Sequence, residues 1–489
     1  MSTEATSLDP LAPATAMSPS EAARNRLVIA LLLVSSFVVI LNETIMSVAI
    51  PHLMADLGVT AGAAQWLTTA FLLTMAVVIP ITGFLLQRIN TRPIFALAMT
   101  TFSIGTLICA ISPGIELLIV GRVVQAIGTA IMMPLLMTTV MTLVPPDRRG
   151  VVMGNISIVI SVAPALGPTI SGFILAHLDW RWMFILVLPI AIGSLLIGLR
   201  NIQNVTTTRY APLDVLSVIL SALAFGGIVY GLSSLGESVN GEQLIPYWAP
   251  LAVGVVVMVV FVLRQLKLQH NDAALLDLRT FASRNFTVSI ILMGISMMAM
   301  FGMVILLPIY TQNVLHLDVL ETGLMMLPGG LLMGLLGPVV GRLYDRVGPT
   351  VLVVPGTVLV SAVMWALTLV GQTTPVWQVL VGHVIISIGL ALVFTPLYTA
   401  ALSSLRQDLY SHGSAILGSV QQVAGAAGVA LFVALMTLQS ASLGAAGEDA
   451  VSALAGGLRS AFMVGASISL LAVVASFFIR RPEADAPGH

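Results

Sequence analysis

Long apolar stretches alternate with short polar segments along most of this 489-residue chain. A helix needs about 20 mostly apolar residues to cross the ~30 Å hydrocarbon core of a bilayer. Fourteen stretches approach or exceed this length, and each predicts a membrane-spanning α-helix. They cover residues 27–50, 63–86, 93–112, 115–144, 151–176, 181–199, 212–234, 245–266, 285–311, 320–344, 350–371, 375–404, 411–438 and 458–479. The pattern therefore predicts an all-α integral membrane protein with 14 transmembrane helices.

Positively charged residues gather on one side of these predicted helices. Because the number of helices is even, both termini lie on the same side, and 17 of the 20 Lys and Arg residues fall there. Loops rich in Lys and Arg stay in the cytoplasm. We therefore expect a multi-pass protein of the plasma membrane, specifically a bacterial inner membrane, with cytoplasmic termini. The expected cytoplasmic loops include 145–150, 200–211 and 267–284, and the external loops include 235–244 and 439–457.

Two pairs of similar segments indicate an internal repeat. GFLLQRINTRP at 83–93 follows the second predicted helix, and GRLYDRVGPT at 341–350 follows the tenth. GRVVQAIGTA at 121–130 and GHVIISIGLA at 382–391 lie near the starts of the fourth and twelfth. Both pairs are eight helices apart, which predicts two six-helix lobes with two extra helices between them. The expected division is a disordered cytoplasmic tail at 1–26, lobes at 27–200 and 285–481, the extra helices and a cytoplasmic linker at 201–284, and a C-terminal tail at 482–489.

Composition excludes several other classes of protein. With 58% hydrophobic residues, 8% charged residues and a net charge of −1, the chain has no basic surface for nucleic acid. A single cysteine, Cys109, excludes an internal disulfide and a cysteine-based metal cluster. The only lysine, Lys267, follows Leu266, so a phosphate-binding G-x-x-x-x-G-K-[ST] loop is excluded. Since the sequence also has no metal-ligand cluster or nucleophile elbow, we expect neither an enzyme nor a bound cofactor.

Five motifs resemble signatures of the fourteen-helix drug:proton antiporters of the major facilitator superfamily. They are LNETIMSVAIP at 41–51, GFLLQRINTR at 83–92, RVVQAIGTA at 122–130, PALGPTISG at 164–172 and DWRWMFILVLPI at 179–190. The resemblance implies a major facilitator fold that moves substrates by alternating access. The chain departs from these signatures at Asn42 and Gln87, where they have Asp, at Ser47, where they have Asn, and at Asn90, where they have Gly.

Several residues are candidates for gating. Gly83 ends a helix tightly and Arg88 anchors the turn that follows, while Asp345 and Arg346 in the second repeat could form a latch between neighbouring helices. In the fifth predicted helix, prolines bend the helix and glycines permit close contact. These residues are Pro164, Gly167, Pro168 and Gly172. Topology anchoring and tight packing are the alternative interpretations.

A second set of residues is expected to bind the substrate. Flexible methionines and polar amides within apolar helices suit a pocket that accepts many compounds. The candidates are Asn42, Met46, Gln125, Tyr310, Gln312 and Gln422. Packing in the core and hydrogen bonding between helices are the alternatives for such side chains.

Glu43 is a carboxyl group deep in a membrane helix, where insertion costs at least ~2.5 kcal/mol. Arg122 and His383 are expected at the same depth, ~10 to 12 Å below the outer surface. In the fold that the resemblance implies, their helices line the central cavity. A proton and a substrate that compete at Glu43 would give antiport. A static ion pair between Glu43 and Arg122 is the alternative.

The sequence thus predicts a secondary transporter, expected to be monomeric, that exports lipophilic drug-like compounds in exchange for protons. Its partners are these small molecules, protons and the lipid bilayer. A cation preference would rest on Glu43, although Arg122 could equally receive an anion. A dedicated exporter of one metabolite or lipid and a non-transporting membrane receptor are the alternatives.

Overall fold

The computed structural model describes residues 19–59, 61–204, 214–237, 246 and 248–481. Within this part, fourteen helices are long and apolar enough to cross a membrane. Their bounds are α1 Pro19–Leu57, α2 Ala61–Arg88, α3 Thr91–Ala110, α4 Ile115–Leu143, α5 Arg149–His177, α6 Trp182–Asn201, α7 Val215–Glu237, α8 Trp248–Leu268, α9 Arg284–Asn313, α10 Val319–Val347, α11 Thr350–Leu367, α12 Val376–Ser403, α13 Tyr410–Ala445 and α14 Ala450–Ser476. The prediction of an all-α membrane protein with 14 spans is confirmed.

Local sequence explains where these helices begin and end, as α10 illustrates. Asp318 accepts a hydrogen bond from the backbone of Glu321 at 2.7 Å, and the Glu321 carboxylate accepts one from the Asp318 backbone at 3.0 Å. This reciprocal cap satisfies backbone donors that the first turn leaves unpaired. At the other end, Gly348 has a φ of 80°, which glycine adopts without steric cost, and the helix stops.

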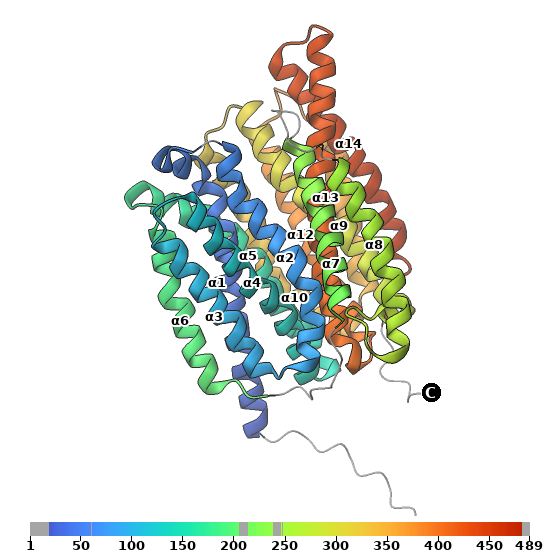
Figure 1. The fold of residues 1–489 in the computed structure, drawn as a ribbon. Helices are drawn as coiled ribbons and strands as arrows, with labels where there is room; N and C mark the ends of the chain where they lie inside the picture. Colours follow the sequence, from blue (N-terminus) through green and yellow to red (C-terminus); the bar gives the residue numbers. More distant parts are fainter. Residues whose placement is uncertain (1–18, 60, 205–213, 238–245, 247, 482–489) are drawn as a thin grey trace, which may run out of the picture.

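Four predicted helix boundaries were wrong by seven or eight residues, and one of them is the end of α1, at Leu57 instead of residue 50. Helix α1 begins at Pro19, so residues 19–26 are helical and the predicted tail is at most 1–18, which lies outside the described residues. Helices α13 and α14 continue past their apolar parts, so the external loop predicted at 439–457 shrinks to 446–449. Figure 1 shows this hairpin rising above the other helices. Alanine and leucine in the extended segments favour helix even in water.

The predicted loops at the other end of the bundle contain short structure. A 3-10 helix at Pro146–Arg148 lies within 145–150, and two more lie within 267–284, at Gln269–Asn271 and Leu278–Ala282. Parts of the predicted loops 200–211 and 235–244 lie outside the described residues, as does the tail 482–489.

The helices form two groups that we call the first bundle, α1–α6, and the second bundle, α9–α14. The bundles meet through α5 against α10 and α12, and through α13 against α2 and α4. The extra helix α7 packs on both α2 and α13, and α8 packs on α7. We call the end where α1 begins the terminus side, and the opposite end the far side (Figure 1).

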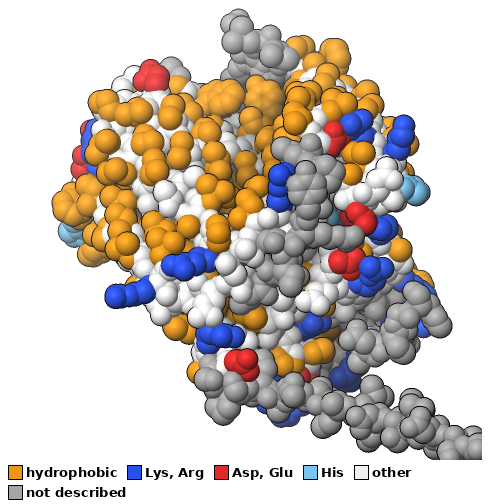
Figure 2. Space-filling model, turned by 60° about the horizontal axis from the view of Figure 1, so that its bottom comes forward, with side chains coloured by type: hydrophobic (Ala, Val, Ile, Leu, Met, Phe, Trp, Pro, Cys, Tyr) orange, Lys and Arg blue, Asp and Glu red, His pale blue; other side chains and the backbone are white. Residues whose placement is uncertain are grey.

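The surface agrees with a membrane environment. Large apolar side chains such as Leu196, Val256 and Leu335 are 61 to 64% exposed along the flanks. Figure 2 shows hydrophobic side chains covering the flank and Lys and Arg side chains gathered around the terminus side. A flank covered by exposed apolar side chains suits lipid as the surrounding solvent.

Candidate substrate and proton site

Arg122 of α4 is the centre of a buried polar network in the first bundle. Its side chain is 1% exposed. One guanidinium nitrogen donates to the amide oxygens of Gln125 at 2.8 Å and Asn42 at 3.3 Å, and Nε donates to the Leu67 carbonyl at 3.4 Å. The Phe71 ring lies 4.0 Å from the guanidinium carbon, in cation–π geometry. The arginine is therefore held by neutral acceptors and an aromatic face.

Gln125 is itself fixed in this network. Its amide nitrogen donates to the Thr106 hydroxyl at 2.8 Å, and Thr106 donates to the Phe102 carbonyl at 2.7 Å. Because Gln125 is fully buried and its oxygen and nitrogen are engaged by α4 and α3, the structure gives it a positioning role toward Arg122. The prediction that it binds substrate stays untested.

Glu43 lies beside this network without joining it. Its carboxylate and the Arg122 guanidinium are within electrostatic range of each other. Among the interactions of the described residues, however, there is no ion pair between them, and the neighbouring residue Asn42 contacts the arginine instead. Glu43 is half-buried. The fixed ion pair considered as an alternative from the sequence is therefore absent in this conformation.

His383 lies in the second bundle and contacts α10. Its Nε2 is 3.0 Å from the Met326 carbonyl, and the ring packs on Gly329. Its buried Nδ1 has no hydrogen-bond partner. No contact joins His383 to Glu43 or Arg122 within the part of the chain that the structure describes, so the predicted cluster of three contains only two neighbours.

The other predicted substrate residues fall in different surroundings. Met46 is 2% exposed in an apolar cluster with Leu67 and Cys109, so in this conformation it packs the first bundle. The buried Tyr310 donates its hydroxyl to the Gly371 carbonyl at 2.7 Å and ties α9 to the loop after α11. Gln312 and Gln422, the two remaining candidates, are half-buried.

Asp345 forms a latch between the bundles at the terminus side. Its carboxylate accepts from the backbone nitrogens of Gly150 at 2.8 Å and Val151 at 3.0 Å, which belong to the first turn of α5. A carboxylate at a helix N-terminus satisfies free donors and complements the helix dipole. Arg346, the predicted partner of Asp345, does not pair with its side chain. Its backbone oxygen instead lies 3.5 Å from Arg481.

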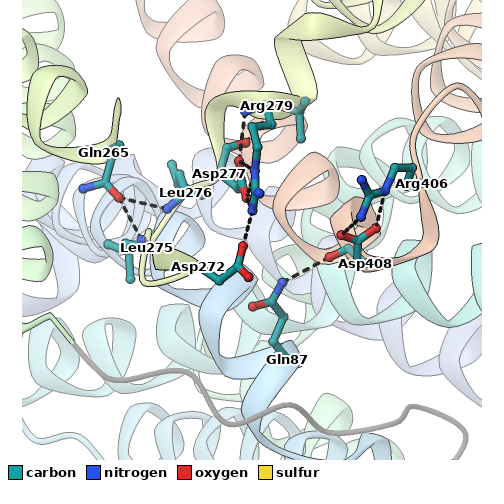
Figure 3. A network of polar contacts seen from close by, with 10 residues as sticks. Gln87, Gln265, Asp272, Leu275, Leu276, Asp277, Arg279, Arg406 and Asp408 are labelled. Carbon is teal, nitrogen blue, oxygen red and sulfur yellow. Dashed lines mark hydrogen bonds and ion pairs between the residues drawn. The ribbon is translucent and has the colours of Figure 1, made fainter. Parts of the chain in front are cut away.

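The corresponding position in the first repeat is neutral. The Gln87 amide donates to the Asp408 backbone oxygen at 3.2 Å, from α2 to the segment before α13. Figure 3 shows this contact next to an ion pair of Asp408 with Arg406 and a second one of Asp272 with Arg279. The Gln87 side chain thus contacts the second bundle without adding a further charge to this surface of acidic and basic residues.

At both of these contacts, the backbones of the two bundles also approach each other closely. A Cβ on Gly83 would lie 3.1 Å from that of Ala415 and 3.3 Å from the Ser411 oxygen of α13. A Cβ on Gly341 would collide with the backbone of Gly150. Arg88 was predicted to anchor the turn after α2. Its guanidinium carbon lies 5.9 Å from the centre of the Phe84 ring.

The gating candidates in α5 differ from one another. A Cβ on Gly167 would meet the Thr44 side chain of α1, so this glycine packs within the first bundle. A Cβ on Gly172 would have no neighbouring atom within 4 Å. Pro164 lies half-buried within the continuous helix. The backbone of Pro168 is helical, but its side chain lies outside the described residues.

All cross-bundle hydrogen bonds of the described residues lie in the half nearest the terminus side. Besides those of Asp345 and Gln87, they join Ser157 to Thr395 at 2.6 Å and Thr138 to Ser414 at 2.7 Å. Sequence reasoning missed these hydroxyl pairs, because single Ser and Thr residues in apolar helices carry no distinctive pattern. The bundles are therefore fastened together at the terminus side in this conformation.

A polar network also holds the extra helices. Arg264 of α8 binds the Asp214 carboxylate with two hydrogen bonds of 2.7 and 2.9 Å. This bidentate contact lowers the pKa of Asp214 to about 2. Next to it, the fully buried Gln265 donates to Ser217 at 2.7 Å. Its amide oxygen accepts from the Leu275 backbone at 2.7 Å (Figure 3). The linker before α9 is thereby joined to α8.

Two helical bundles that meet at a polar seam, with a charged pair inside one of them, are typical of a membrane transporter. Comparison with known proteins supports this class. The model of the Major Facilitator Superfamily matches residues 32–429. Lincomycin resistance protein LmrB of Listeria monocytogenes is 39% identical over 93% of this chain and 96% of that protein. The MFS-type transporter YcnB of Bacillus subtilis is 37% identical over 94% and 96%. The chain belongs to the major facilitator superfamily, as its motifs suggested.

Solved structures agree on the fold. The human organic anion transporter MFSD10 (TETRAN) has a TM-score of 0.67 at 16% identity, covering 94% of this chain and 100% of that one. The proton:xylose symporter XylE has a TM-score of 0.64 at 14% identity, covering 94% and 97%.

Proposed function

We propose that this protein exports lipophilic, drug-like compounds in exchange for protons. Lincomycin resistance proteins at 36 to 39% identity support export of an antibiotic-like substrate. The observation that carries proton exchange is the placement of Glu43, a half-buried carboxyl group deep in α1 whose partner Arg122 is held elsewhere. A carboxylate free of a fixed ion pair can take up and release a proton without dismantling a salt bridge.

The fastened side indicates which way the site faces in this conformation. Under the positive-inside rule the terminus side faces the cytoplasm of a bacterial cell. The latch at Asp345 and the contact at Gln87 then close the cytoplasmic side, and this conformation faces outward. In the exchange we propose, a proton that binds Glu43 here accompanies the return of the empty site to the cytoplasm. Substrate enters there, the proton leaves, and the bundles rock back.

The test uses the full chain in proteoliposomes with an imposed pH gradient and a panel of lipophilic compounds. The native protein should move several of them against the gradient, and Glu43→Gln should abolish this exchange while keeping the fold. Arg122→Gln serves as a comparison, because it leaves the carboxyl group in place but removes the network. Intact gradient-driven transport by a stable Glu43→Gln protein would contradict the proton role of Glu43. Transport of one compound alone would indicate a dedicated exporter.

A further inference from the structure

Asn42 sets the net charge of the site at α1 and α4. Apart from helix ends, Glu43 and Arg122 are the only fully charged groups that the sequence places within the spans of the first bundle. When Glu43 is ionised, its charge cancels that of Arg122. When it is protonated, the site carries one positive charge. Asn42, which accepts from Arg122 at 3.3 Å, contributes none.

The aromatic face nearest this site is also occupied. A cationic ligand in a buried pocket is commonly bound over an aromatic ring. Here the Arg122 guanidinium already stands 4.0 Å over the ring of Phe71, which is 1% exposed. The other neighbours of the guanidinium are the Gln125 amide, the Leu67 carbonyl and the Cys109 thiol, none of which adds a negative charge at neutral pH.

We propose that this site selects uncharged lipophilic compounds over permanent cations, and that Asn42 is the residue that determines this specificity. The inference rests on the proposed function, because it concerns the substrate of the same site. A permanent cation gains no net attraction while Glu43 is ionised and is repelled once Glu43 is protonated. An uncharged compound experiences neither effect, so its binding energy comes from apolar contact.

Two substitutions add one negative charge with almost no change of shape. Asn42→Asp and Gln125→Glu each keep an acceptor oxygen toward Arg122, and both oxygens face the same guanidinium nitrogen. Either variant makes the site negative while Glu43 is ionised. Two unit charges about 10 Å apart at an effective dielectric constant of ~20 interact strongly enough for a roughly tenfold change in a binding constant.

The experiment compares 4-phenylpyridine, uncharged at neutral pH, with its permanently cationic N-methyl derivative. Binding of both probes to the purified full chain gives a ratio of dissociation constants, and a common skeleton removes differences in apolar contact. The native protein should bind the neutral probe more tightly, and Asn42→Asp or Gln125→Glu should shift the ratio toward the cation by about tenfold or more. Asn42→Gln adds no charge, and Gln378→Glu adds one on an exposed side chain at the start of α12, outside the site, so neither should shift the ratio.

Three results would overturn the inference. They are tighter binding of the cation by the native protein, an unchanged ratio in both acidic variants that fold, and an equal shift in Gln378→Glu. If neither acidic variant folds, the native measurement still decides whether the site prefers the uncharged probe. Because binding is measured without a pH gradient, a loss of proton-driven transport would count against the proposed function and leave this result intact.

Discussion

Removing the charge of Asp345 should open the terminus side of the protein. In Asp345→Asn the new amide keeps one acceptor for the backbone nitrogens of Gly150 and Val151, which the carboxylate binds at 2.8 and 3.0 Å. The amide nitrogen faces the other donor and leaves it unpaired, at a cost of about 1–3 kcal/mol. Loss of the charge at the helix N-terminus adds about 0.3–1 kcal/mol.

This free-energy cost of Asp345→Asn applies only to the conformation in which the terminus side is closed. When the bundles separate at this side, water can bind the first turn of α5, so the open state loses nothing. A total of about 1.3–4 kcal/mol lowers the ratio of closed to open molecules by roughly 10- to 700-fold, since 1.4 kcal/mol is a factor of ten. The latch is partly exposed, which favours the lower part of this range.

Distances between spin labels report this change directly. Arg148 and Arg406 lie in different bundles at the terminus side, and their side chains are 79 and 80% exposed. Labels at these two positions, in a chain with Cys109→Ala, should move apart in Asp345→Asn. Arg346→Gln is the matched control, because the Arg346 side chain does not bind Asp345. An unchanged distance distribution in a folded Asp345→Asn protein would refute the latch.

Three further predictions concern other parts of the chain. Gly167→Val should lower stability by about 1–3 kcal/mol and slow transport, because its side chain meets Thr44, whereas Gly172→Ala should have little effect in thermal unfolding and efflux assays. Asp214→Asn should destabilise the protein by about 1–2 kcal/mol at neutral pH. Because the pKa of Asp214 is depressed to about 2, this difference in melting temperature from the native protein should shrink as the pH falls from about 4 through 2, and a constant difference would contradict it. Glu448→Cys, on the exposed far side, should react with an impermeant thiol reagent in intact cells, and reaction only after permeabilisation would reverse the expected orientation.

The helices could be predicted because hydrocarbon imposes a minimum apolar length on each one. The same rule misplaced the ends of α1, α13 and α14, since a helix can continue into water where its residues favour helix. Depth in the membrane could likewise be counted from the helix ends, and it correctly brought Glu43 close to Arg122.

The depth of a residue in the membrane does not specify which side of its helix the side chain faces. Adjacent residues point about 100° apart, and this rotation places Asn42 rather than Glu43 against Arg122. His383 shares the predicted depth and lies in the second bundle, as the predicted division requires, but counting along its helix cannot reveal that its ring contacts α10 instead of Glu43 or Arg122. The partner of Asp345 was missed for another reason. It consists of backbone N–H groups, which every residue except proline carries and which therefore leave no mark in the sequence.

The Asp345 latch also bears on how the chain is made. It joins residues 195 positions apart, so α5 is synthesised long before the carboxylate that caps it. At ~5–20 residues per second, the first turn of α5 waits roughly 10 to 40 s for its partner. During that time the first bundle must persist in the membrane with its seam uncovered. Its own contacts, among them the Arg122 network of α1, α2, α3 and α4, must therefore suffice to hold a half-finished protein together.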